Sequence, residues 1–316
     1  MEKNIKLATS NTVSSAYVGD VAGEIIGAAF LEGSTLSLGV VTVAENVNYK
    51  YNLRKIRYTD GTTNYSCGFV PAGAVVLSEK VITPKKVMNS LQLCKEDFRQ
   101  TWSEKSMGAS ASNPNAPNDI MEAIQLEWLS NQAAKVDDDI WNGLNATDGE
   151  IGDGFIVQFA ADGDVIKANN GITALNAATT ESNVEAHLKA ALNAIPVALR
   201  KKDVQVLVSS NVFQAYTFYL ISKGIAWNGT TDDKTAKFGR YNLVEIQGYP
   251  DDTIVCAEKK NLVFATGLQG DHNDISLVDE DEIGLLTGNV RGKMVYNGGV
   301  GYYNSEEIVW LLTTTA

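Results

Sequence analysis

The chain has 316 residues, of which 44% are apolar and 20% are charged, and it contains only 6 prolines. This composition is typical of a folded protein and excludes a disordered or low-complexity chain. The length is sufficient for two ordinary domains or for one large core with extensions. Acidic residues outnumber basic ones by 38 to 26, giving a net charge of −12. That balance argues against broad binding to nucleic acid, which relies on Lys and Arg to neutralise phosphates.

Cysteine usage and the first residues bear on the cellular compartment. The three cysteines, Cys67, Cys94 and Cys256, are widely spaced and form no CxxC pair, so neither a disulfide framework nor a thiolate zinc site is indicated. Residues 1–15 are polar and lack the apolar stretch of a signal peptide, and the longest apolar run, 25–31, is far too short to cross a membrane. We therefore expect reduced thiols in a protein made and kept in a cytoplasm, unless it leaves inside something larger.

The N-terminal part is predicted to be an arm followed by β-structure. Residues 1–18 are polar and predict an extended arm, and residues 19–31 carry a short helical pattern closed by Gly33. Residues 35–47 alternate enough between apolar and polar to predict a strand.

A long β-ribbon is predicted from about Asn48 to Ile82. Its first strand reaches Tyr58, residues 59–62 are a hairpin turn signal, and residues 64–70 and 74–82 are predicted to return, separated by a break at 71–73. A two-stranded ribbon is only marginally stable alone in water. Either it lies on its own domain or another chain holds it, and we favour the second alternative.

One long helix is predicted from Asn118 to Leu144, because prolines precede it and Gly143 and Gly149 follow it. Its apolar residues form two stripes on different faces. Such a helix packs on its own domain along one length and on something else along another; burial in an ordinary core is the alternative. The stripes are Ile120, Ile124 and Trp128, and Leu126, Leu129, Ala133, Val136, Ile140 and Leu144.

The second half predicts a compact α/β unit. Strands are expected at 155–159 and 165–167, and a capping box of Ser182 and Glu185 opens an amphipathic helix that Pro196 kinks or ends. A strand at 204–208, a helix at 212–221 and short strands at 243–246, 253–256 and 262–264 follow. The chain closes with strands at 291–296 and 306–312, joined through a glycine-rich region at 298–301.

The sequence indicates no catalytic, cofactor-binding or metal site. The chain has two histidines, His187 and His272, and neither has the sequence context of a nucleophilic site. The acidic clusters match no calcium-loop spacing, and neighbouring carboxylates such as Asp137 to Asp139 point in different directions along a helix. We expect His187 and these clusters to be solvated. A carboxylate-metal hydrolase stays an alternative, as does an exported surface or adhesion protein.

Several segments spread along the chain form a characteristic set, of which Cys94–Trp102 is the most specific. The others are Tyr17–Gly23, Asn46-Val47 with Tyr49-Lys50, Leu91–Leu93, Met107–Ser110, Ile140–Gly143, Val206–Ser210 and Gly248–Asp252. Together these segments resemble the major capsid proteins of tailed phages, most of all those of crAss-like phages and their relatives that infect Bacteroidetes.

This resemblance implies an α+β chain with the Hong Kong 97 capsid fold. It implies an N-arm at 1–41, an extended β-hairpin E-loop with its return strand at 42–92, and a peripheral domain with a long spine helix at 93–170. An α/β axial domain at 171–274 and return strands of the peripheral domain at 275–316 complete the expected division.

The resemblance also implies a function as a shell subunit that encloses the double-stranded DNA genome of a tailed phage. The expected partners are other copies, as hexamers and pentamers, with separate scaffold, portal and minor capsid proteins. DNA is enclosed without sequence-specific binding, no membrane is involved, and the protein is expected in the virion after assembly in the host cytoplasm. An encapsulin-like or prophage-derived compartment shell is the alternative. We expect inter-subunit contacts at Arg54, Lys55, Arg57, Tyr58 and Trp128, the basic residues meeting an acidic partner surface.

Overall fold

The computed structural model describes residues 34–47, 49–65, 67–68, 71–94, 118–168, 177–224, 235–267, 276–281, 284 and 287–312. The predictions for the arm, for the helix at 19–31, for the segment from 95 to 117 and for His272 lie outside these residues. Of the helices within them, none is both long enough and apolar enough to cross a membrane.

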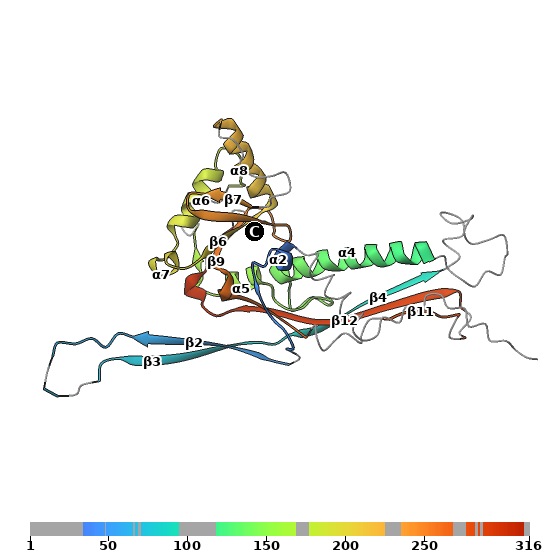
Figure 1. The fold of residues 1–316 in the computed structure, drawn as a ribbon, viewed down its shortest axis with the longest axis horizontal. Helices are drawn as coiled ribbons and strands as arrows, with labels where there is room; N and C mark the ends of the chain where they lie inside the picture. The colour runs from blue at the N-terminus through green and yellow to red at the C-terminus, as the bar shows by residue number, and fades with distance from the viewer. Residues whose placement is uncertain are drawn as a thin grey trace, which may run out of the picture.

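The described strands form three sheets (Figure 1). A five-stranded sheet is built around the long strand β12 (Asn289–Tyr302), which pairs along one edge with β4 (Lys85–Cys94). Its other edge pairs with β11 (Ser276–Asp279) and β10 (Leu262–Thr266), and β1 (Thr42–Ala44) lies parallel to β10. The second sheet has six strands, in the order β5 (Ile166–Lys167), β13 (Val309–Leu312), β9 (Thr253–Glu258), β6 (Val204–Ser209), β8 (Tyr241–Ile246) and β7 (Thr235–Phe238). The third sheet is the two-stranded ribbon of β2 (Tyr51–Thr59) and β3 (Ala74–Ile82).

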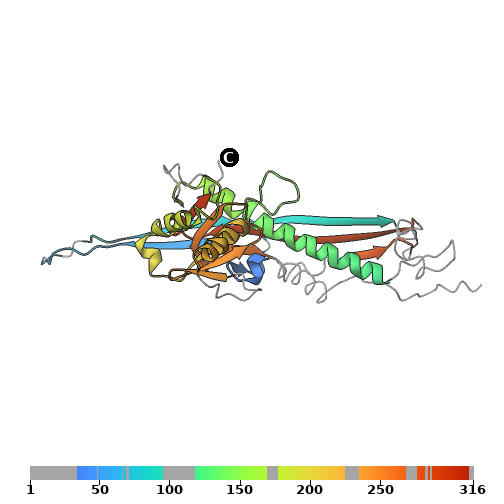
Figure 2. The same cartoon turned by 90° about the horizontal axis from the view of Figure 1, so that it is seen from above.

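The described helices pack around these sheets. They are α2 (Ser34–Ser37), α4 (Asn118–Asn142), α5 (Phe155–Ala161), α6 (Val184–Asn193), α7 (Val197–Arg200) and α8 (Ser210–Ser222), with short turns η2 (Lys259–Asn261) and η3 (Ser305–Glu307). In Figures 1 and 2, α4 runs beside β4 and β12 toward one end of an elongated molecule, and the ribbon projects toward the other.

The six-stranded sheet is buried on both faces. Alternate residues of β6 and β9, such as Val206 and Cys256, face α6 and α8 in one core, while Leu207 and Val255 face α4 and α5 in the other. Because one sheet belongs to both cores, the α6–α8 unit and the α4 region share a continuous interior. The ring of Trp141 on α4 also meets the ring of Tyr249, which follows β8, edge-on at 4.3 Å.

The long helix is confirmed, and its C-terminal half is core. Ala133, Val136 and Ile140 are buried. The backbone N–H of Thr35 donates to Asp137 Oδ1 at 2.9 Å, and Trp141 Nε1 donates to Thr35 Oγ1 at 2.6 Å. These bonds hold α2 against α4. The start of the strand predicted at 35–47 is therefore one helical turn, Ser34–Ser37, and Gly39 with φ +62° follows that turn.

Further predicted elements need correction. Residues 155–159 are not a strand but helix α5, because Phe155 and Phe159 lie one helical turn apart and stack at 5.9 Å in the core. Ser182 does not cap α6: its hydroxyl bonds to Thr180, and the cap residue is Asn183. The return strand of the ribbon is β3 alone, and the described residues among 60–73 form no strand. Residues 305–307 form η3, so the last strand is β13 alone.

The polar residues expected in solvent are partly interior. His187 is fully buried, with its Nδ1 at 3.1 Å from Thr179 Oγ1. Asp137 and Asp139 are buried, whereas Asp138 between them is exposed. Asp252 is buried as well, at φ +62°, and its carboxylate accepts hydrogen bonds from Thr179 N and Asn211 Nδ2. Buried carboxylates need such partners, so these residues have structural roles.

The last strands of the chain pair with strands from earlier parts of the sequence. Strand β12 pairs with β4 and runs unbroken through the glycines at 298–301. On its other edge β12 pairs with β10, while β13 pairs with β9 in the six-stranded sheet.

The base of the ribbon is anchored in a small core of its own. Leu53 and Ile82 are buried there with Val47, Val263 and Ala265. Glycines of β12 make the close approach possible: a Cβ at Gly301 would lie 2.7 Å from Ile82 Cγ1 and 2.9 Å from its Cδ1. The ribbon therefore leaves the body from a fixed, apolar foot.

We expect Gly301→Ala to lower the free energy of unfolding by ~1–3 kcal/mol, because the added methyl displaces Ile82. In combination with Ile82→Ala the loss should be smaller than the sum of the two single losses, since the clash is then removed. Denaturant unfolding of the four proteins measures this. Gly163→Ala, at a glycine with no atom within 4 Å of an added Cβ, is the control. Strictly additive losses contradict the proposed contact.

Candidate inter-subunit surface

The ribbon has two distinct faces. In its antiparallel register Leu53 lies opposite Lys80 and Ile56 lies opposite Leu77, and residues directly opposite share a face. One face, here called the body face, carries Tyr51, Leu53, Lys55, Arg57 and Thr59 of β2 with Ile82, Lys80, Ser78, Val76 and Ala74 of β3. The other, the outer face, carries Asn52, Arg54, Ile56 and Tyr58 with Val81, Glu79, Leu77 and Val75.

The body face is held by residues at the end of β12 and beyond it. Lys80 Nζ lies 3.3 Å from the centroid of the Tyr302 ring, and the Tyr302 hydroxyl donates to Asp162 Oδ2 at 2.7 Å. Burial lowers the pKa of the Lys80 ammonium, and the nearby Asp162 carboxylate partly offsets this. An ammonium over an aromatic ring is a favourable contact, stronger when desolvated. Lys80 thus fastens the ribbon just beyond its apolar base.

Two of the basic residues expected to meet a partner are directed to their own chain. Lys55 Nζ donates to Asn304 Oδ1 at 2.5 Å, and Arg57 Nη1 lies 3.0 Å from Glu306 Oε1. The Arg57–Glu306 pair is largely exposed, and such pairs contribute little stability. These contacts place Lys55 and Arg57 on the body face, where a contact with a second copy stays untested.

The other predicted ribbon residues, Arg54 and Tyr58, lie on the outer face and are exposed. Every residue of this face is exposed, including the apolar Ile56, Val75, Leu77 and Val81. Which face the body covers depends on residues 302–306, far away in the sequence, so the sequence alone did not separate the basic residues of the two faces.

The last predicted contact residue, Trp128, is in α4. It is half-buried and packs against the core that α4 and α5 share. Its indole Nε1 is buried and has no hydrogen-bond acceptor among the described residues. Trp128 therefore contributes to its own chain's core, apart from the ribbon residues, and a contact with a second copy stays a prediction.

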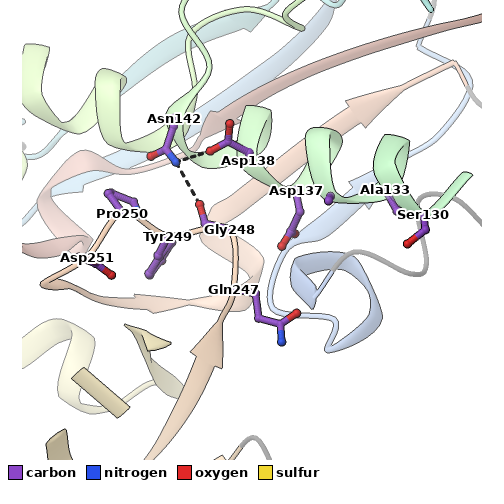
Figure 3. Close-up of a pocket in the computed structure, with 11 residues that line it drawn as sticks. Ser130, Ala133, Asp137, Asp138, Asn142, Gln247, Gly248, Tyr249, Pro250 and Asp251 are labelled. Carbon is purple, nitrogen blue, oxygen red and sulfur yellow. Dashed lines mark hydrogen bonds between the residues drawn. The ribbon is translucent and has the colours of Figure 1, made fainter. Parts of the chain in front are cut away.

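A cleft of about 590 Å³ lies between α4 and the turn that follows β8 (Figure 3). Asp137, Asp138 and Asp251 line it, and Asn142 Nδ2 donates across its edge to Asp138 Oδ1 at 2.6 Å and to the Gly248 carbonyl at 3.1 Å. In the part of the chain that the structure describes, no group of His, Cys, Asp and Glu side chains could hold a metal ion. The cleft offers acidic oxygens, but it collects none of the predicted contact residues.

Beside the cleft, Asp139 is a fully buried carboxylate. Its Oδ1 lies 2.6 Å from Lys135 Nζ, which is also 3.4 Å from Glu150 Oε1. Burial raises the pKa of Asp139 to about 6, although the bond from Lys135 acts in the opposite direction. The folded protein therefore holds a proton on Asp139 more tightly than the unfolded chain does.

We expect Asp139→Asn to stabilise the fold at neutral pH. Raising the pKa of Asp139 from 3.8 to about 6 corresponds to ~3 kcal/mol of stability, present below pH 3.8 and lost as the pH rises through 6. The asparagine stays neutral, so its free energy of unfolding should exceed that of the wild type by ~1–3 kcal/mol at pH 8 and by much less at pH 4.5. Denaturant unfolding at both values tests this, with the exposed Asp138→Asn as control. A variant less stable than the wild type at pH 8 contradicts the assignment.

The chain has no match among protein-family models or curated proteins. Solved structures do match it along nearly its whole length. A chain of the satellite phage P4 procapsid has a TM-score of 0.53 at 10% identity, covering 93% of this chain and 99% of its own. A capsid chain of the empty GTA particle has a TM-score of 0.56 at 10% identity, covering 90% of each chain. A chain of the virus-like particle from Pyrococcus furiosus has a TM-score of 0.51 at 11% identity, covering 91% of this chain and 96% of its own.

At such low identity these matches establish the fold and nothing finer. The solved structures are described as a procapsid, a capsid, a virus-like particle and a phage. The described residues thus have the mixed helix-and-sheet fold of these capsid and particle chains.

Proposed function

We propose that the chain is the major capsid protein of a tailed phage, a structural subunit with the Hong Kong 97 fold whose copies assemble into an icosahedral shell around double-stranded DNA. The observation that carries the proposal is the likeness to capsid chains over about nine-tenths of both chains. The resemblance of Cys94–Trp102 and other segments to capsid proteins of crAss-like phages points in the same direction.

In this proposal the elements take the names of that fold. Strands β2 and β3 form the E-loop, α4 is the spine helix of the peripheral domain, and the unit with α6 and α8 is the axial domain. The segment 1–41 supplies the N-arm. The proposed boundaries lie at 92, which falls within β4, at 170 and at 274; across the last of them β10 pairs with β12 and β13 pairs with β9.

Assembly follows from the geometry of repeated contacts. Identical chains with head-to-tail contacts close into rings when the rotation permits, which gives pentamers and hexamers. The ribbon reaches away from its own body and so can lie over a neighbour (Figure 1). Each linked contact raises the effective concentration for the next, so several moderate interfaces suffice. The excess of acidic residues favours a wall to which packaged DNA does not adhere.

The proposed setting is the virion, after assembly in the host cytoplasm with separate scaffold, portal and minor capsid proteins. A cellular compartment shell is not favoured, because the matching structures are mostly phage particles. Electron microscopy of the purified chain over a range of concentrations tests the function. Closed shells or rings support it, and a monomer at every concentration contradicts it.

Removing the ribbon beyond its anchored base should block assembly and spare the fold. We expect a variant in which an Asn-Gly turn replaces residues 55–78, joining the paired Arg54 and Glu79, to keep a folded body because Leu53 and Ile82 are retained. The fraction of protein in particles, measured by sedimentation, should fall at least ~10-fold. Circular dichroism and the unfolding midpoint check the body. Shells of normal yield from this variant would show that the ribbon plays no part in assembly.

A further inference from the structure

We propose that the outer face of the ribbon, with Ile56, Tyr58, Val75 and Leu77 at its centre, is the surface that docks on a second copy of this chain. This inference rests on the proposed function and makes it more specific, because it names the face and its chemistry. It departs from the expectation that the basic residues as a group form the contact.

The first argument is that the body face is already in use. Its proximal residues are buried or half-buried: Leu53 and Ile82 in the ribbon's foot, Lys80 over Tyr302, and Lys55 beside Asn304. A docking mode through the proximal part of this face would first have to break those contacts, whereas one through the outer face keeps all of them.

The second argument is the composition of the outer face. Ile56 and Leu77 are each 70% exposed, Tyr58 65% and Val75 63%. Ile56 and Leu77 lie directly opposite each other, as do Tyr58 and Val75, so the four side chains form one block across both strands. Large apolar side chains gathered in one exposed patch are typical of an interaction site, while scattered ones are not.

The third argument concerns what covers the patch. Arg54 borders it on the same face and makes no ion pair with any described residue. Its charge suits an acidic partner surface, and on a second copy, with a net charge of −12, acidic residues outnumber basic ones. The occupant is therefore another copy, seated on the apolar block with Arg54 at its edge.

Three substitutions on the ribbon give a matched test. Leu77→Asp on β3 and Ile56→Asp on β2 each put a charge on the outer face. Val76→Asp puts the same charge on the body face; Val76 precedes Leu77 in the chain and is 53% exposed. All three sites are exposed in the single chain, so the folded subunit should keep its circular dichroism spectrum and unfolding midpoint.

The particle fraction is measured by sedimentation at equal concentrations of wild type and variants. We expect Leu77→Asp and Ile56→Asp each to lower it at least ~10-fold, and Val76→Asp to change it less than ~2-fold. Equal losses in all three variants, or normal assembly of the outer-face variants, overturn the assignment of the face while the shell function stands. A wild type that stays monomeric at every concentration overturns both.

Discussion

A two-stranded ribbon has no second layer to cover it, and this constraint governs how the molecule must behave. Beyond its foot at Leu53 and Ile82, the ribbon buries little of its own surface and carries large apolar side chains in solvent. Three or more strands, or a packed helix, are needed before such a sheet is independently stable. The missing layer would come from outside the chain, and in the proposed function other copies of the same chain provide it.

The six-stranded sheet of the body is organised in the opposite way, because the chain itself covers both of its faces. The six-stranded sheet has helices on both faces, and Trp141, Tyr249 and Phe155 join α4, α5 and the turn after β8 in one aromatic cluster. The body fixes the position at which the ribbon starts, through the close approach of Gly301 to the ribbon and the contact between Lys80 and Tyr302. The chain itself thus sets the direction of the ribbon, and in the proposed assembly a neighbouring copy provides the surface on which it docks.

Local patterns predicted the elements that local forces determine. The long helix was predictable because prolines precede it and apolar residues repeat at helical spacing up to Ile140. The two strands of the ribbon were predictable from their strand-forming residues, but the tight turn expected at 59–62 was wrong, because β2 ends at Thr59 and β3 begins only at Ala74. Patterns failed where distant residues decide: Phe155 and Phe159 suit either a strand or a helix, and the core selects the helix. Asp139 and His187 are buried by partners that no spacing reveals. Arg54 and Lys55 lie on opposite faces because they are neighbours in a strand, but which face the body covers depends on Asn304 and Glu306.

Hydrogen exchange of the ribbon amides, compared between dissociated subunits and assembled particles, tests the central claim most directly. The account predicts fast exchange for residues 54–59 and 74–79 in the free subunit, because only one neighbouring strand protects them, and strong protection in the particle. Slow exchange in the free subunit, unchanged on assembly, would mean that the ribbon is completed by its own body and would contradict the account.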